Sequence, residues 1–259
     1  MIKLEKPVYK QEKIIDDCIS NMQEGILKQH ILDSKNEIIS GGATKDDMIK
    51  LYDRKFVPKG EGGRKYYDAI KLLSPNLICP YCAQRDVDTL DHYLPKAKYP
   101  IYAITPYNLV PSCMGCNKVK VDNVFQQRAE ETIHPYYDDF ASEKWIAAQM
   151  IEGDPVAFRF IVQCPDTWDS VKKERAQKHF EQFKLNDLYK NKASQEYIGC
   201  LNRIKRSYRR GGKTLAIEDL REHIEDKDVI HPNTWQAAMY QAIIDNEWFW
   251  NVYLPEMIV

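Results

Sequence analysis

The chain has 259 residues, 44% of them hydrophobic, and its basic and acidic residues balance to a formal net charge of −1. This composition is ordinary for a folded globular protein and does not favour a disordered chain. It also excludes the broad positive field of many autonomous nucleic-acid-binding proteins, so any contact with nucleic acid must be local.

The sequence predicts a cytoplasmic protein without membrane contact. It has no run of about 18 or more apolar residues that could cross a bilayer. It begins with a charged segment where a secretory signal would be apolar. In a reducing compartment the seven cysteines are expected to be thiols or metal ligands rather than disulfides.

Apolar periodicity gives the expected elements in chain order. One or two helices are predicted from residue 10 to about 39, and others from Thr44 and from about 63 to 73. Recurrent prolines from 75 to 135 indicate short, irregular elements. Further helices are predicted at 143–151, 168–183, 185–210, 216–225 and 233–252. We predict a predominantly helical α+β fold with an N-terminal helical region (1–74), a central region (75–140) and a C-terminal helical region (141–259) packed with the centre as one unit.

Two cysteine pairs with CxxC spacing bound the central region. Cys79 and Cys82 form the first pair, and Cys113 and Cys116 form the second. Four thiolates complete a tetrahedral zinc site and leave no open position for water, so the predicted zinc is structural. The remaining cysteines, Cys18, Cys164 and Cys200, are expected to be core residues.

The segment between the pairs carries residues suited to phosphodiester hydrolysis. Residues 89–95 and 107–113 each indicate a short strand, and 116–120 begin a helix, so the order is strand, strand, helix. A neutral imidazole such as His92 can take a proton from water. Oxygens of Asp91 and Asn117 can hold a divalent cation, and the Asn108 amide can orient the imidazole.

Asp91-His92, Asn108 and Asn117 resemble the signature positions of HNH endonucleases, in the variant whose last histidine is asparagine. The resemblance implies a ββα-metal core within the zinc-bounded segment. It implies that His92 is the general base, that Asn108 orients it, and that Asp91 and Asn117 bind catalytic Mg²⁺ or Mn²⁺.

A second likeness concerns the biological setting. The motifs CPYC, LDHYLPK, NLVPSCMGCN and IHPYYD together are similar to the HNH subunits of Septu-type and retron-associated anti-phage systems. This likeness implies a DNA-cutting effector that works with an ATPase subunit of the SMC or ABC type. Two alternatives stay open: a nuclease that attacks RNA such as tRNA, and a non-catalytic zinc module that binds nucleic acid or protein.

For three parts of the sequence, two functional interpretations remain open. His134 either approaches the scissile phosphate or packs in a turn, and packing is favoured. Lys118 and Lys120 either contact flanking phosphates or form solvated surface. The basic stretch from Arg203 to Lys213 is either a solvated helix face before a Gly-Gly stop, which is favoured, or a phosphate-binding segment.

Overall fold

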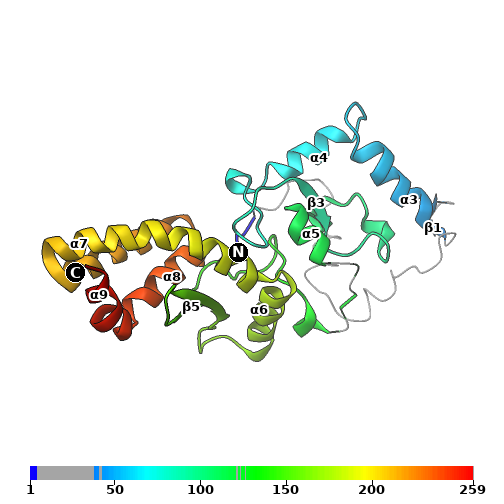
Figure 1. Cartoon of the computed structure of the whole chain (residues 1–259). Coiled ribbons are helices and arrows are strands. Elements are labelled where there is room, and N and C mark those ends of the chain that lie inside the picture. The colour runs from blue at the N-terminus through cyan, green and yellow to red at the C-terminus, as the bar shows by residue number, and fades with distance from the viewer. Residues whose placement is uncertain (5–37, 41–42, 121, 123, 126, 259) are drawn as a thin grey trace. The chain divides into compact units, whose positions relative to one another are not determined.

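A computed structural model describes residues 1–4, 38–40, 43–120, 122, 124–125 and 127–258. The helices predicted from residue 10 fall mostly outside these ranges, as does Cys18, but residues 38–40 form strand β1, paired with β2 (Ala43–Thr44). The fold is α+β and mostly helical, as predicted (Figure 1). It divides into two compact units, Ile2–Asp139 and Phe140–Val259 with Met1. No helix in the described ranges has the length and apolarity needed to cross a bilayer.

The first unit begins its described core with helix α3 (Lys45–Leu51). Thr44 caps this helix in a capping box, because its hydroxyl accepts from the Asp47 amide and its amide donates to the Asp47 carboxylate. A π-helical turn (Tyr52–Phe56) and a loop lead to helix α4 (Arg64–Lys71). These elements share one apolar core with the following hairpin, built from Tyr52, Phe56, Tyr67, Ile70, Leu90, Ala103 and Leu109.

The predicted order of strand, strand and helix is present in the middle of this unit. Strand β3 (Thr89–His92) pairs antiparallel with β4 (Leu109–Ser112), so that Thr89 faces Ser112 and His92 faces Leu109. Helix α5 (Met114–Lys120) follows directly and packs against β3. The second strand starts later than predicted, because Pro106–Asn108 form a 3₁₀ turn.

The second unit opens with a hairpin, β5 (Ile146–Ile151) and β6 (Ala157–Val162), followed by α6 (Ser170–Gln182), α7 (Leu185–Ile230) and α8 (Trp235–Ile244). Helix α8 packs on β5 and α7 packs on β6. The helix predicted at 143–151 is therefore wrong. Its sequence has no strong strand signal, but pairing with β6 and packing against α8 outweigh local propensity.

One continuous helix was predicted over 233–252, but the structure has two helical segments in this region. Helix α8 ends at Ile244, and the chain restarts as a π-helical turn (Phe249–Tyr253) that runs into α9 (Leu254–Ile258). The Asn246 carboxamide accepts a hydrogen bond from the Phe249 amide at 2.7 Å and so caps the restart. A polar cap inside an apolar pattern therefore ends one helix and begins the next.

Helix α7 reverses direction at Gly211–Gly212, as the Gly-Gly stop predicts. Gly212 has φ of 71° and Gly211 is also non-helical. Arg203 Nε lies 3.7 Å from the Asp219 carboxylate. Sixteen residues of straight helix would separate these side chains by about 24 Å. The two halves of α7 therefore form a helical hairpin with the glycines at its tip.

A buried Asn233 ties the connection between α7 and α8 to the start of the β5–β6 hairpin. Its Oδ1 accepts from the Trp145 amide at 2.7 Å, and its Nδ2 donates to the Glu143 carbonyl at 2.8 Å. The amide of Asn233 in turn donates to Nδ1 of the buried His231 at 2.9 Å. This arrangement requires His231 to keep an unprotonated nitrogen.

Acid should destabilise the protein partly through His231. Burial lowers the pKa of His231 from 6.5 to about 2, so the folded state stays neutral while the unfolded chain takes up a proton. Stability is therefore lost as pH falls below about 6.5, by up to about 1.4 kcal/mol per pH unit from this group. Urea unfolding at pH 7 and pH 5 should show a smaller acid penalty in His231→Gln than in the parent. Equal penalties would contradict the assignment.

Candidate metal centre and active site

Four cysteine sulfurs converge at the base of the β3–β4 hairpin. Cys79 and Cys82 precede β3, Cys113 directly follows β4 and Cys116 lies in α5. All four are buried, and their Sγ atoms lie within 4.8 Å of one another. This confirms that the two CxxC pairs meet at one point. In a tetrathiolate zinc site with Zn–S of about 2.3 Å, sulfurs are roughly 3.8 Å apart. The cluster can therefore hold a metal ion such as zinc.

Local hydrogen bonds shape both cysteine pairs into metal-binding turns. In the first pair the Cys79 amide donates to the Arg85 carbonyl at 2.7 Å and the Ala83 amide donates to the Cys79 carbonyl at 2.8 Å. In the second pair the Cys116 amide donates to Cys113 Sγ at 3.3 Å. Hydrogen bonds from the neighbouring thiols lower the pKa of Cys113, whereas hydrogen bonds to the other three cysteines raise the pKa of Cys116. The shared contacts thus favour the thiolate at Cys113 and the thiol at Cys116, and a bound metal would have to displace the remaining protons.

The exposed Arg85 guanidinium lies over the second pair. Burial acts to lower its pKa, but a hydrogen bond to Cys113 and the charges of the nearby cysteines together raise it. A Cβ added at Gly115 would stand 2.7 Å from Arg85 Nη1, so glycine leaves room for this contact. Arg85 therefore offsets part of the negative charge that four thiolates bring to the cluster.

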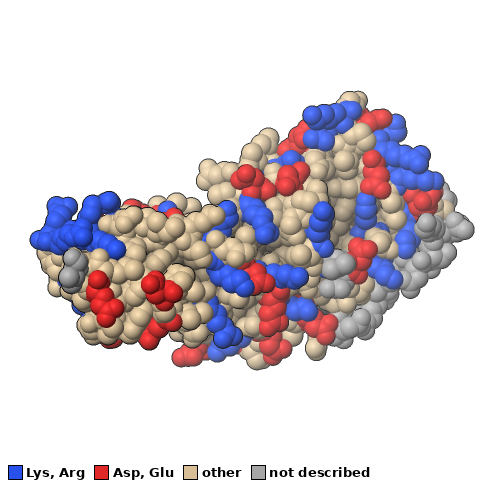
Figure 2. Space-filling view, viewed as in Figure 1, with Lys and Arg blue, Asp and Glu red and all other residues tan. Residues whose placement is uncertain are grey.

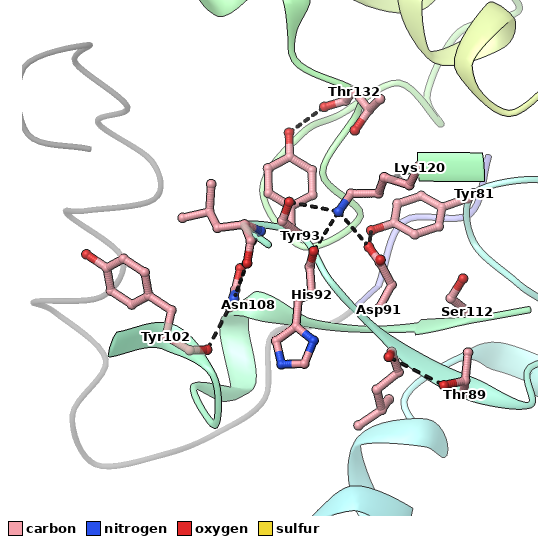
Figure 3. A network of polar contacts seen from close by, with 12 residues as sticks. Tyr81, Thr89, Asp91, His92, Tyr93, Tyr102, Asn108, Ser112, Lys120 and Thr132 are labelled. Carbon is pink, nitrogen blue, oxygen red and sulfur yellow. Dashed lines mark hydrogen bonds and ion pairs between the residues drawn. The ribbon is translucent and has the colours of Figure 1, made fainter. Parts of the chain in front are cut away.

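Asp91 lies in a buried polar network on β3 (Figure 3). Its Oδ2 accepts from the Tyr81 hydroxyl at 2.8 Å and forms an ion pair with Lys120 Nζ at 3.0 Å. Burial, followed by the Asp91 charge, raises the pKa of Tyr81, so the phenol keeps its proton and donates it. Asp91 Oδ1 makes no hydrogen bond to any described residue.

Lys120 is buried, which corrects both interpretations of it as a phosphate contact or a solvated side chain. Its side chain is 4% exposed, and Nζ also donates to the carbonyls of His92 at 2.6 Å and Tyr93 at 2.8 Å. The last residue of α5 therefore holds the end of β3 in place. Lys118, on the same helix, is exposed as expected.

His92 is half-buried, and its ring lies on the other side of β3 from the Asp91 carboxylate (Figure 3). Nε2 is 2.8 Å from the Ala103 carbonyl oxygen. Because a carbonyl only accepts, Nε2 carries the proton and Nδ1 keeps its lone pair. Burial lowers the pKa of His92 to about 4, which keeps the ring neutral near pH 7. The Tyr52 ring packs edge-on at 4.4 Å between centroids.

The Asn108 amide does not contact the His92 ring, contrary to expectation. Asn108 is fully buried: its Oδ1 accepts from the Leu94 amide at 2.7 Å, and its Nδ2 donates to the carbonyls of Leu94 at 3.0 Å and Tyr102 at 3.1 Å. These bonds fix the backbone just after His92 and just before Ala103. Asn108 therefore positions the His92 ring indirectly, by fixing the two backbone segments that carry His92 and Ala103.

Asp91, His92 and Asn117 line one cavity of about 340 Å³. Asn117 is half-buried on α5, and its side chain makes no hydrogen bond within the described ranges. Lys96 also lines this cavity, with Nζ 4.6 Å above the Tyr52 ring and paired with Asp53 at 2.5 Å. The structure thus brings three of the four expected catalytic residues to one space, and Asn108 supports them from behind.

Sequence reasoning missed two residues of this site, Tyr81 and Lys96, and gave Lys120 the wrong role. Tyr81 lies inside the first cysteine pair and Lys96 directly follows the LDHYLP motif, so position alone could have marked both. His134, in contrast, is where the favoured interpretation placed it. It is buried, and its ring packs 4.1 Å from Tyr93 between centroids.

Comparison with known proteins gives one informative likeness. Protein ea31 of Escherichia phage lambda is 34% identical to the chain over 226 residues, which cover 82% of this chain and 76% of ea31. No family model matches the chain, and no solved structure matches it significantly. At that identity and coverage, this chain belongs to the family of the phage lambda protein ea31.

Proposed function

We propose that the protein is a metal-dependent endonuclease of the HNH type that hydrolyses phosphodiester bonds of DNA. The observation that carries this proposal is the His92 ring, held by the Ala103 carbonyl with Nδ1 unprotonated, on a cavity shared with Asp91 and Asn117. The position of this constellation on a strand, strand and helix, beside four clustered cysteines, supports the same proposal.

The donor set in the cavity fits a hard divalent cation. Asp91 Oδ1 and the amide oxygen of Asn117 would hold the ion, and oxygen ligands are those that Mg²⁺ and Mn²⁺ prefer. When bound, the cation neutralises charge that builds on the phosphate and the departing oxygen. Lys120 pairs with the other oxygen of Asp91 and supplies a counter-charge to this carboxylate.

The protein's own residues then supply the proton transfer. His92 Nδ1 takes a proton from the attacking water, because Nε2–H is already committed to Ala103. The new positive charge on the ring is stabilised by that carbonyl and by the nearby Asp91 carboxylate. Lys96, 29% exposed at the cavity, is suited to contact a substrate phosphate.

The cysteine cluster has a structural part in this proposal. A zinc ion bound by four thiolates has no open position for water, so it fixes α5 against the hairpin and takes no part in hydrolysis. Because Asn117 and Lys120 both lie on α5, the position of that helix sets the distance between Asn117 and Asp91.

The biological role follows from the motif likeness alone and forms part of the same proposal. We take the protein as the nuclease effector of an anti-phage system that acts with an ATPase subunit of the SMC or ABC type. Cleavage should then appear, or increase, when an ATPase subunit of this type is added. RNA is the second candidate substrate, since no residue on the cavity distinguishes deoxyribose from ribose.

Replacing His92 with alanine should reduce cleavage at least 100-fold, because general-base catalysis contributes about 10²–10⁴ to rate. The assay uses labelled duplex DNA and total RNA side by side, with Mg²⁺ or Mn²⁺. Metal content of the cysteine cluster and the unfolding midpoint should stay close to the parent values. His223→Ala, a half-buried histidine on α7 in the other unit, is the matched control.

Two outcomes would count against the nuclease proposal. Cleavage by His92→Ala at the parent rate would remove His92 from the mechanism. Failure of the parent protein to cut any nucleic acid, alone and with an ATPase subunit of the SMC or ABC type, would favour the non-catalytic zinc module.

A further inference from the structure

The tip of the α7 hairpin concentrates positive charge that the proposed active site does not use. Between Glu196 and Glu218 the sequence contains no acidic residue, and its basic residues there are Arg203, Lys205, Arg206, Arg209, Arg210 and Lys213. In Figure 1 helix α7 forms one end of the second unit. Figure 2 shows Lys and Arg side chains gathered at this end. The rest of the chain must therefore be net acidic.

The cations at the two ends of this stretch are neutralised, and those in the middle are not. Arg203 pairs with Asp219 across the hairpin at 3.7 Å, and Lys213 pairs with Glu247 at 3.0 Å. Lys205, Arg206, Arg209 and Arg210, here called the arginine tip, form no ion pair with any described residue. Its three arginines are exposed, and Lys205 is half-buried.

Helix geometry arranges the arginine tip in two neighbouring rows. Residues four apart lie on the same helix face, so Lys205 stands beside Arg209 and Arg206 stands beside Arg210. Each pair is separated by about 6 Å along the axis, which is close to the spacing of successive phosphates in a nucleic-acid strand. Guanidinium groups also match phosphate oxygens in a bidentate geometry.

We infer that the arginine tip is a nucleic-acid-binding surface that contacts backbone phosphates without reading the base sequence. No large apolar residue of α7 between residues 199 and 228 is exposed, whereas a protein interface has an apolar centre. The choice of nucleic acid over an acidic protein also rests on the proposed nuclease function. The surface belongs to the second unit, whereas the cavity of His92 belongs to the first.

A simpler role for these cations is compensation of the helix dipole at the end of the first half of α7. That role predicts a change in stability and no change in binding. It also needs fewer cations than are present, because the dipole effect falls off within the last turn. Binding and unfolding measured on the same variants separate the two roles.

The test removes three charges from the tip of the full-length chain. R206Q/R209Q/R210Q is made in a His92→Ala background without added divalent cation, so that cleavage does not interfere. The control, K178Q/K192Q/R221Q, removes the same charge from exposed or half-exposed positions of the same unit. Fluorescence anisotropy measures binding of labelled duplex DNA, single-stranded DNA and RNA over a range of salt concentrations.

The tip variant should bind nucleic acid at least 10-fold more weakly than its parent. The slope of log affinity against log salt concentration should fall by roughly two to three. The affinity of the control variant should stay within about twofold of its parent. Unchanged binding by the tip variant would overturn the inference, as would an equal loss in the control or absence of binding by the parent. Because binding is read without cleavage, this result is independent of whether His92 proves catalytic.

Discussion

Substituting Cys116 with serine should release the metal from the cysteine cluster and loosen the β3–β4–α5 segment. All four sulfurs are needed for a closed site, and structural zinc binding is folding free energy. Bound metal should fall from about one ion per chain to nearly none. The unfolding midpoint of the first unit should drop by roughly 10 °C or more, which corresponds to several kcal/mol. Metal analysis and thermal unfolding measure both effects.

Cys164→Ser is the matched control for this substitution. Cys164 is half-buried and lies in the second unit, so the same chemical change should leave metal content unaltered. If Cys116→Ser kept a full complement of metal, the cysteine cluster would not be the metal site. If metal were lost with no change in unfolding, the ion would not brace the fold.

The cysteine cluster was predictable because its signal is local and repeated. Each CxxC pair turns two thiols to one side, and two such pairs in one short segment leave few alternatives to a shared metal site. The two short strands were likewise visible, since proline-bounded apolar runs mark them in the sequence. These predictions needed no knowledge of distant contacts.

Elements set by distant contacts were not predictable. Residues 146–151 form a strand only because β6 pairs with them and α8 covers them, and neither partner is visible from the segment itself. The Asn108 amide was expected to hold the His92 ring, but it bonds Leu94 and Tyr102 instead. Its position in the motif was informative, whereas its bonding partners depend on how the intervening loop folds.

The buried ion pair of Asp91 and Lys120 is a further contact between distant residues that the sequence did not predict. On α5, Lys120 shares a face with Cys116 and Lys118 lies on another face, but this spacing does not give the Asp91 carboxylate of β3 as the partner of Lys120. The cluster at Cys116 fixes the rotation of that helix and so directs Lys120 inward. The metal site and the polar network of the cavity are therefore mechanically linked.

Replacing Lys120 with methionine should destabilise the first unit by about 3–5 kcal/mol, since it leaves the Asp91 carboxylate buried without its counter-charge. The carbonyls of His92 and Tyr93 would lose their donor as well. Urea unfolding measures the loss. Lys118→Met, an exposed change on the same helix, should cost less than about 1 kcal/mol.

A second substitution separates the ion pair from simple packing. Asp91→Asn in the Lys120→Met background removes the stranded charge, so the double variant should be more stable than Lys120→Met alone, although Asp91→Asn by itself should be destabilising. Such a reversal requires that the two side chains interact directly. If Lys120→Met cost no more than Lys118→Met, or if the two substitutions were simply additive, Lys120 would not compensate Asp91. The carboxylate would then need another partner before it could be assigned a place beside the proposed catalytic cation.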